Sequence, residues 1–212
     1  MTVQPSGSMH GLYVIVDTQA MAGRPFDKTV EQVLLGGARI LQYRDKTSEN
    51  ARRLDQARIL STLCHRYAAT LFINDDPELA VAVDAQGVHL GRQDTTVAHV
   101  RAAFPQLLVG ASCYNSLERA RRNVADGAAY VAFGSFFPSP TKPQAIRAEA
   151  DLLTRARQEF DVPLVAIGGI MADNARGLIE SGADAVAVIS AVLKADDPQR
   201  ASREIADMFG AG

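Results

Sequence analysis

The stretch LLVGASCYNSLERARRNVADGAAYVAFG, residues Leu107–Gly134, contains a strand, a helix and a second strand. Its two ends, LLVGAS and AYVAFG, are short apolar runs of the kind found in strands that are covered on both faces. Between them, Leu117–Asp126 has its apolar residues at helical spacing, and the DG pair at Asp126–Gly127 is typical of a helix end. The stretch therefore predicts one strand–helix–strand unit of a parallel sheet.

Units of this kind run along the whole chain. Strands are expected at Leu12–Asp17, Arg39–Arg44, Thr70–Asn74, Gly87–Leu90, Leu107–Ser112, Ala129–Gly134, Pro163–Gly169 and Ala185–Ser190. Helices are expected at Asp27–Leu35, Glu49–Tyr67, Leu117–Asp126, Ala148–Phe160 and Asp173–Ser181. Eight alternations without a linker-like segment favour one (β/α)8 barrel, the TIM-barrel class of α/β fold. An open doubly wound sheet is the alternative, because eight parallel strands do not exclude it.

Length and composition suit one domain. Of the 212 residues, residues 1–10 are expected to form a flexible tail without the apolar core of a signal peptide, and residues 11–212 a catalytic barrel. A hydrophobic content of 47% allows a sizeable core, whereas a net charge of −2 gives no reason to expect nucleic acid or a membrane surface as a partner. The two cysteines, Cys64 and Cys113, lack metal-ligand spacing and suit reduced thiols in a cytoplasmic protein. The oligomeric state is left open, with a homodimer among the options.

Polar residues and glycines gather where the expected strands end. The strands run into QYRDK, NDD and GRQD, and later into Ser112, the loop SFFPSPTKPQ, Gly168–Gly169 and Ser190. In a barrel these loops all open on the face where barrel enzymes place their sites. Solubility alone would not produce this bias, because polar helix faces on the outside of the barrel already provide it. The pattern predicts a small-molecule site on the C-terminal rim.

The chemistry of this rim suggests phosphate and a metal ion. Three cations, one amide and two carboxylates stand on it: Arg44, Lys46, Lys142, Asn74, Asp75 and Asp94. The two carboxylates follow neighbouring strands, so they can converge on one hard cation. Because Mg²⁺ prefers a few carboxylates, water and phosphate oxygens, the set predicts a magnesium-bound diphosphate.

Two of the aspartates have a simpler interpretation as helix caps. Asp94 can cap a helix that begins in TTVAHVRAAF, and Asp76 can cap the helix that begins at Pro77. Asp75 stands one residue earlier, at the strand end, and is the better metal ligand of the NDD run.

A second anion site is suggested by the last two strand ends. Gly168 and Gly169 offer backbone N–H groups that no side chain blocks, and Ser190 stands at the expected start of a short helix. Barrels often bind a phosphate monoester in this place. The alternative for the glycine pair is a tight turn without a ligand.

At these positions the sequence resembles the thiamine-phosphate synthase family, which joins the pyrimidine and thiazole halves of thiamine phosphate. The resemblance is carried by LQYRDK, FINDD, GVHLGRQD, VGAS, FGSFFPSPTKP, VAIGGI and AVAVIS, in the family's order, from about Leu12 to Leu193. It implies a (β/α)8 barrel, one Mg²⁺ per subunit, and condensation of 4-amino-2-methyl-5-(diphosphooxymethyl)pyrimidine with thiazole phosphate, with release of pyrophosphate. Whether the thiazole phosphate carries a carboxylate stays open.

The resemblance also implies roles for single residues. Contacts with the pyrimidine substrate and its diphosphate are implied for Gln42, Tyr43, Arg44, Asp45, Lys46, Asn74, Ser112 and Lys142. Of these, Arg44, Lys46, Ser112 and Lys142 are implied as catalytic, and Asp75 and Asp94 as magnesium ligands. Contacts with the thiazole phosphate are implied for Ser139, Pro140, Thr141, Gly169, Ile189 and Ser190. Tyr43, Ser139 and the residues Cys113–Asn115 depart from the family's commoner residues, which concerns the shape of the pyrimidine pocket.

The residues themselves favour a dissociative reaction. The sequence shows no Ser-His-Asp or Cys-His arrangement, and a diphosphate can leave without a protein nucleophile. The rim cations would stabilise the charge on the departing group. Prolines at three positions, Pro138, Pro140 and Pro143, would stiffen the loop that presents Lys142.

Three further rim or strand residues have no assigned role in this chemistry. His89 is expected inside the barrel or on its rim rather than on a metal, and Cys113 is expected to be a small buried thiol. Asp17 is on the correct face, without an identified function. The rival functions are a thiazole tautomerase relative, another phosphate-binding epimerase or decarboxylase barrel, and a non-catalytic sensor of thiamine phosphates.

Overall fold

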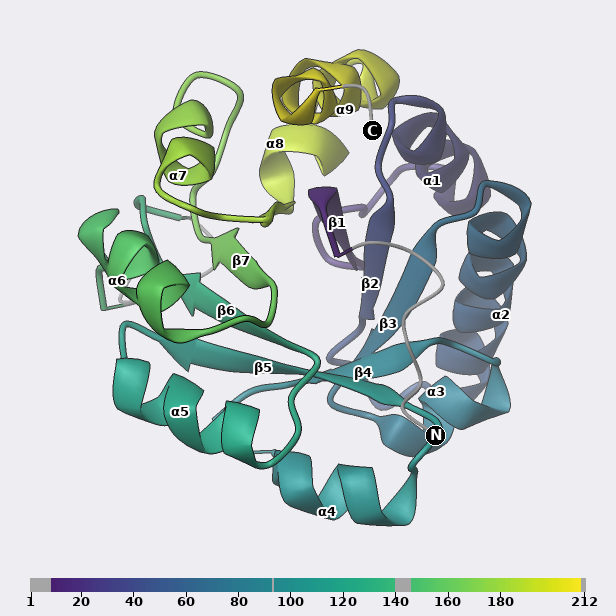
Figure 1. Cartoon of the computed structure of the whole chain (residues 1–212). Coiled ribbons are helices and arrows are strands. Elements are labelled where there is room, and N and C mark those ends of the chain that lie inside the picture. Colours follow the sequence, from purple (N-terminus) through teal and green to yellow (C-terminus); the bar gives the residue numbers. More distant parts are fainter. Residues whose placement is uncertain (1–8, 93, 140–145, 211–212) are drawn as a thin grey trace.

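The strands close into a barrel in a computed structural model that describes residues 9–92, 94–139 and 146–210. They are β1 (Gly11–Asp17), β2 (Ile40–Arg44), β3 (Thr70–Asn74), β4 (Gly87–Leu90), β5 (Leu108–Tyr114), β6 (Tyr130–Gly134), β7 (Leu164–Ile167) and β8 (Ala185–Val188). Each strand pairs in parallel with the next, and β8 pairs with β1, so that the order around the barrel follows the sequence (Figure 1). The predicted (β/α)8 barrel is confirmed, and the open-sheet alternative was wrong.

Helices surround this barrel. They are α1 (Phe26–Leu35), α2 (Asn50–Arg66), α3 (Pro77–Ala82), α4 (Val97–Ala103), α5 (Leu117–Ala125), α6 (Asp151–Glu159), α7 (Arg176–Glu180), α8 (Ser190–Leu193) and α9 (Pro198–Ala206), followed by the 3-10 turn η1 (Asp207–Phe209). Among the described residues, no helix is both long and apolar enough to pass through a bilayer.

Several predicted boundaries move for identifiable reasons. The helix expected from Ala148 begins at Asp151, because the backbone N–H of Ala148 is bonded to Ser135 O at 2.9 Å in the preceding loop. The strand expected to reach Gly169 ends at Ile167, because Gly168 and Gly169 have positive φ values of 104° and 65°. These residues belong to the rim loops rather than to the regular elements.

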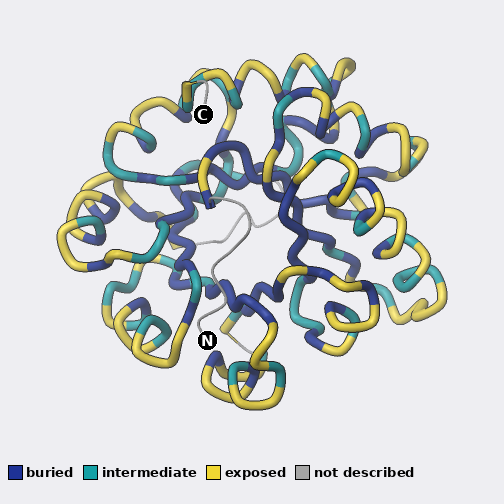
Figure 2. Tube along the Cα trace, turned by 45° about the vertical axis from the view of Figure 1, so that its right-hand side comes forward, coloured by how far each residue is buried: buried dark blue, intermediate teal, exposed yellow. Residues whose placement is uncertain are grey.

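Two apolar cores hold the fold together. On β1, Leu12, Val14 and Val16 face the helices, whereas Tyr13 and Ile15 face the barrel interior. Figure 2 shows the consequence as a dark blue ring of buried strands with yellow turns on the outer helices. Side chains thus fill the barrel interior, and the C-terminal ends of the strands are left as the place for a site.

The expected tail is partly described. Met9 is only 4% exposed and joins the interior cluster, and the ring of His10 contacts Phe209 edge-on at 5.2 Å between centroids. Residues 1–8 lie outside the described residues.

Candidate active site

Strand alternation places the β2 residues. Gln42 and Arg44 lie on the interior side of β2, and Tyr43 between them lies in the outer core. In the strand register Arg44 is opposite Asp17, the last residue of β1. The guanidinium of Arg44 donates to the Asp17 carboxylate, which also accepts the backbone N–H groups of Gln19 at 3.1 Å and Ala20 at 3.0 Å. Asp17 therefore fixes the direction in which Arg44 extends over the barrel mouth.

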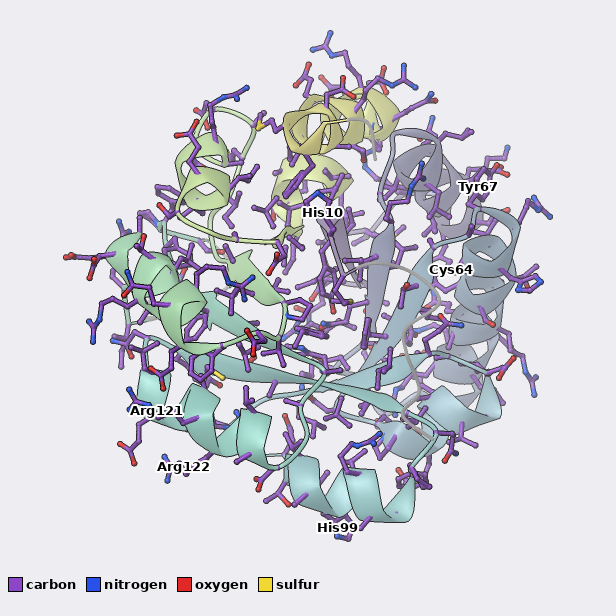
Figure 3. The ribbon with its side chains drawn as sticks, in the orientation of Figure 1. His10, Cys64, Tyr67, His99, Arg121 and Arg122 are labelled. Atoms are coloured by element: carbon purple, nitrogen blue, oxygen red, sulfur yellow. The ribbon has the colours of Figure 1, made fainter. Side chains whose placement is uncertain are left out.

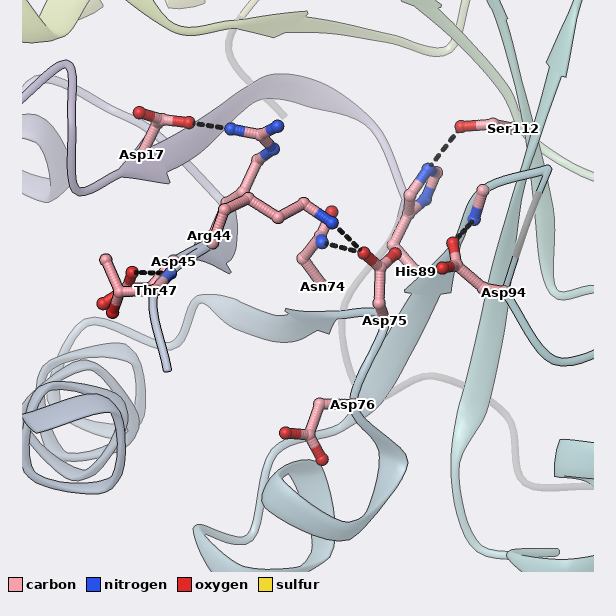
Figure 4. A network of polar contacts seen from close by, with 12 residues as sticks. Asp17, Arg44, Asp45, Thr47, Asn74, Asp75, Asp76, His89, Asp94 and Ser112 are labelled. Carbon is pink, nitrogen blue, oxygen red and sulfur yellow. Dashed lines mark hydrogen bonds and ion pairs between the residues drawn. The ribbon is translucent and has the colours of Figure 1, made fainter. Parts of the chain in front are cut away.

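A second group of charges follows β3 and β4. The Asp75 carboxylate accepts hydrogen bonds from Lys46 Nζ and, at 2.6 Å, from Asn74 Nδ2, both at Oδ2. Asp94 accepts the backbone N–H of Gly91 at 2.6 Å. In Figure 4 the carboxyl groups of Asp75 and Asp94 face each other across the gap between their loops. The two carboxylates therefore converge, as the sequence predicts.

The pKa values of the two carboxyl groups are shifted in opposite directions. Burial opposes ionisation of Asp75, but hydrogen bonds from Lys46 and Asp94 outweigh it and lower its pKa. Burial and the hydrogen bond to Asp75 raise the pKa of Asp94. The opposite shifts indicate that the two carboxyl groups interact closely, so that Asp75 ionises more easily than Asp94.

This arrangement fits a magnesium ion. A cation between the carboxyl groups would offset their mutual repulsion, and Asp75 has one oxygen engaged by Lys46 and Asn74, with the other toward Asp94. The described residues contain no group of three His, Cys, Asp or Glu side chains around one point. Mg²⁺ does not need one, since it keeps several waters and takes substrate phosphate oxygens as ligands.

The helix-cap interpretations separate these aspartates. Thr96, not Asp94, caps α4, with its hydroxyl accepting His99 N–H at 3.2 Å, so the cap interpretation of Asp94 was wrong. Asp76 does cap α3, accepting Leu79 N–H at 2.9 Å, as predicted. Asp75 has a φ of 64°, a left-handed conformation, and its carboxylate bonds Lys46 and Asn74 rather than a helix N-terminus.

Ser112 stands near the end of β5, which runs two residues beyond the predicted strand end at Ser112, and it is tied to the loop that carries Asp94. The Arg119 side chain donates from Nε to Ser112 O at 2.9 Å and from Nη2 to Gly91 O at 3.1 Å. Its guanidinium also lies 5.8 Å from the ring centroid of Tyr114. Arg119 thus holds the two rim segments in fixed relation, a role that sequence reasoning missed.

The loops after β6, β7 and β8 form the opposite side of the rim. Phe137 N–H donates to Gly168 O at 2.9 Å, and a Cβ on Gly169 would come within 2.3 Å of Pro138 O. Glycine is therefore required for the close approach of two loops, and not only for a turn. Ser190 begins α8 as predicted, with Ile189 as its cap residue.

The remaining thiazole-site residues are only partly described. Ser139 follows Pro138 and is half-buried. The predictions for Pro140, Thr141 and Lys142 lie outside the described residues, so their contacts stay predictions.

Two residues of the implied substrate set point away from the rim centre. The Tyr43 hydroxyl donates to Gln56 Oε1 at 2.9 Å, and its ring contacts Phe26 edge-on. The Asp45 carboxylate accepts from Thr47 N–H at 2.8 Å (Figure 4) and from Arg52, on α2, at 3.0 Å. Any substrate contact of these two residues would come from their backbone, and it stays a prediction.

The thiols are structural. Cys64 and Cys113 are both free and buried. Burial raises the pKa of Cys64 to about 12 and that of Cys113 to about 11, so both are protonated and unreactive at neutral pH. The prediction that Cys113 is a small buried thiol is confirmed. His99 lies on the outer helix α4, far from the rim centre (Figure 3).

Comparison with known proteins agrees with this geometry. A family model described as thiamine monophosphate synthase matches residues 12–192. A thiamine-phosphate synthase of Acidithiobacillus ferrooxidans is 48% identical over 203 residues, which cover 94% of each chain. A thiamine-phosphate synthase of Methylobacillus flagellatus is 47% identical and covers 99% of this chain and 100% of its own.

Solved structures agree as well. Thiamine phosphate pyrophosphorylase from Pyrococcus furiosus superposes with a TM-score of 0.86 at 35% identity, over 94% of this chain and 95% of its own. A 3-hexulose-6-phosphate synthase shares only the fold, with a TM-score of 0.69 at 18% identity. The chain therefore belongs to the thiamine monophosphate synthase family.

Proposed function

We propose that this chain is a thiamine-phosphate synthase, a transferase that condenses the aminopyrimidine diphosphate with thiazole phosphate and releases pyrophosphate. The observation that carries the proposal is the Asp75–Asp94 pair, flanked by Lys46 and Asn74 and lying on the same rim as Arg44. Two carboxylates beside several cationic or amide donors suit a metal-bound polyanion better than a neutral substrate.

The chain's own residues supply orientation and charge. Arg44, aimed by Asp17, and Lys46, held at Asp75, would bind oxygens of the diphosphate and stabilise the charge that grows as its C–O bond breaks. Mg²⁺ between Asp75 and Asp94 would add positive charge against the same oxygens. The aminopyrimidine ring can delocalise the cation left on its methylene carbon, so no protein nucleophile is needed.

The second substrate would enter from the side of β7 and β8. Backbone N–H groups of Gly169, Ile189 and Ser190 suit the phosphate of the thiazole, and contacts from Ser139, Pro140 and Thr141 are expected from the family resemblance. The thiazole nitrogen would then meet the methylene carbon in line, and holding the two reactants in this geometry removes much of the entropic barrier. Lys142 would complete the set of cations over the diphosphate.

One assay tests the proposal. The purified protein, stripped of metal by chelation, is given both substrates with and without Mg²⁺, and thiamine phosphate and pyrophosphate are measured. We expect equimolar products that depend on the metal. Conversion of a carboxylated thiazole phosphate to an isomer, without diphosphate or metal, would favour the tautomerase instead. A cytoplasmic location and a homodimer, both expected from the sequence, stay predictions.

A further inference from the structure

A chain of hydrogen bonds crosses the barrel interior and joins two residues implied in substrate binding. Gln42 Nε2 donates to Tyr13 OH at 2.7 Å, and the hydroxyls of Tyr13 and Tyr130 are 2.9 Å apart. His89 Nδ1 is 2.7 Å from Tyr130 OH, and His89 Nε2 is 2.9 Å from Ser112 Oγ. The chain thus runs from β2 through β1, β6 and β4 to β5.

Packing holds the members of this chain in place. Tyr13 and Tyr130 are 1% and 0% exposed, and the ring of Phe72 lies edge-on to Tyr130 at 5.2 Å between centroids. A Cβ on Gly110 would come within 2.1 Å of the Tyr130 ring, so this ring occupies the space that the missing side chain leaves. Burial raises the pKa of both phenols, which keeps each hydroxyl proton in place as a donor.

The direction of the hydrogen bonds follows from counting protons. Each phenol has one proton to donate. Because Tyr13 OH accepts from Gln42, it can give its proton to Tyr130 OH, which then gives its own to His89 Nδ1. If His89 donated to Tyr130 instead, one of the two phenols would accept twice, either Tyr13 or Tyr130. The described residues offer no acceptor for the buried proton of that phenol. That would cost an unsatisfied polar group inside the core.

The order fixes the state of His89 and Ser112. With Nδ1 as an acceptor, the imidazole is neutral and carries its proton on Nε2, which donates to Ser112 Oγ. The Ser112 hydroxyl, having accepted, is left to donate its proton toward the rim. At the other end, Gln42 has its amide nitrogen turned to Tyr13 and its carbonyl oxygen turned away.

We propose that Tyr13, Tyr130 and His89 are positioning residues that set Ser112 as a hydrogen-bond donor and Gln42 as an acceptor for the pyrimidine substrate. The inference rests on the proposed function and adds to it the polarity of the two contacts. A donating hydroxyl suits a diphosphate oxygen or a ring nitrogen, and an accepting amide oxygen suits the exocyclic amino group of the aminopyrimidine. None of the three positioning residues needs to touch the substrate.

The state of His89 can be observed directly. The protein is labelled with ¹⁵N-histidine, and long-range ¹H–¹⁵N correlations give the tautomer of each of its 4 histidines. The His89 signals are assigned by their absence in His89→Gln. We expect a neutral ring protonated on Nε2 in the wild type, and loss of this single tautomer in Tyr130→Phe. A wild-type ring protonated on Nδ1, or on both nitrogens, overturns the proposal.

Kinetics separates positioning from general support of the fold. In Tyr130→Phe we expect the KM for the pyrimidine diphosphate to rise about tenfold, the effect of about one hydrogen bond, while the KM for thiazole phosphate stays within about twofold. Tyr67→Phe is the matched control, because Tyr67 OH bonds Glu31 at 2.8 Å on the outside of the barrel (Figure 3). Equal changes in both KM values, or no change in either, contradict the proposal.

A second pair of variants covers the case in which Tyr130→Phe does not fold. His89→Gln keeps an N–H that can donate to Ser112, whereas His89→Leu has similar volume and no donor. We expect His89→Gln to have at least about fivefold higher kcat/KM for the pyrimidine diphosphate than His89→Leu, a difference within the range of one hydrogen bond. Equal kcat/KM values in the two variants would overturn the positioning role of His89. The proposed function would still stand if the wild type forms thiamine phosphate. Absence of thiamine phosphate formation by the wild type would instead refute the proposed function, whatever the tautomer of His89.

Discussion

The Asp17 carboxylate accepts a hydrogen bond from the guanidinium of Arg44, which lies on the neighbouring strand. Only 5% of the Asp17 side chain is exposed. The other Asp17 oxygen accepts two backbone N–H groups, so the carboxylate cannot rotate away. The Arg44 side chain is 21% exposed at the rim, and Asp17 holds its guanidinium in place. These contacts suit Asp17 to orient Arg44, a role that the sequence did not indicate.

Asp17→Asn should therefore impair catalysis more than substrate binding. The amide keeps an oxygen for the backbone N–H groups of Gln19 and Ala20 but loses the charge that orients Arg44. We expect kcat to fall about tenfold with little change in either KM, because a mispositioned cation stabilises the transition state less. Steady-state kinetics measures this, and Asp55→Asn, at an exposed position of α2, controls for the change of charge. A rise in the pyrimidine KM alone would show that Asp17 acts on binding instead.

Asp94→Asn should stabilise the metal-free protein and abolish its response to magnesium. The pKa of Asp94 is raised in the folded state, so its proton stabilises the fold at low pH, and this contribution is lost as the pH rises through the raised pKa. Asparagine imitates the protonated carboxyl at every pH. We expect a higher Tm than wild type in chelator at pH 8, and about a hundredfold loss of activity.

The magnesium dependence of Tm provides the control for this variant. Mg²⁺ should raise the Tm of the wild type through preferential binding to the folded state, and leave that of Asp94→Asn unchanged. An equal rise in both proteins would place the metal elsewhere.

Lys142→Ala should retain the fold and lose about a hundredfold in kcat, by analogy with the removal of one preorganised charge contact. The expectation comes from the sequence, because Lys142 stands in the proline-rich loop after β6 and outside the described residues. Circular dichroism and turnover of the same preparation measure both parts. Lys194→Ala, beyond α8, is the matched loss of a lysine. Normal turnover in folded Lys142→Ala would contradict the assignment.

Much of the rim could be predicted because it depends on local order. Asp75 comes directly after β3, and Asp94 follows β4 by four residues, so parallel strands bring them to one face whatever the side-chain details. The family motif that contains Gln42 and Arg44 likewise stands at the end of one strand. The fold class followed from the same regularity, since each strand and helix repeats a short pattern.

The positioning contacts could not be predicted, because they join residues far apart in the sequence. Tyr13 and Tyr130 are 117 residues apart and meet only when the barrel closes. The contacts of Arg119 with Ser112 and Gly91 likewise depend on a side-chain rotamer. Tyr43 and Asp45 show the opposite case, because the motif implied substrate contacts for both residues and the structure directs their side chains away from the rim centre.

Asp45→Asn should lower stability at neutral pH and lose this effect in acid. Burial opposes ionisation of Asp45, but hydrogen bonds from Thr47 and Arg52 lower its pKa from 3.8 to about 2. A lowered pKa stabilises the fold above the ordinary value, and the contribution disappears as the pH falls from about 4 toward about 2. We expect a loss of about 1 kcal/mol at pH 7, since solvent screens the half-exposed Arg52. Urea unfolding at pH 7 and at pH 3 measures the difference, and an equal loss at both would indicate packing rather than charge.

Gly110→Ala should weaken binding of the pyrimidine substrate by displacing Tyr130. The added Cβ would come within 2.1 Å of Tyr130 Cζ and 2.4 Å of its hydroxyl, so the ring must shift and leave His89. We expect a loss of about 1–3 kcal/mol in the free energy of unfolding from overpacking, and a rise in the pyrimidine KM similar to that of Tyr130→Phe. Gly177→Ala is the matched control, because a Cβ there meets no atom within 4 Å.

The double variant shows whether Gly110 acts on binding through Tyr130 alone. In a Tyr130→Phe background the hydroxyl is already absent, so adding Gly110→Ala should raise the pyrimidine KM little further, although the crowding of the ring still lowers stability. The reason is that the two substitutions break the same hydrogen bond to His89. Steady-state kinetics on the four proteins of this cycle gives the coupling. Additive effects on KM would mean that Gly110 acts on the rim by another route, such as a shift of β5 that moves Ser112 directly.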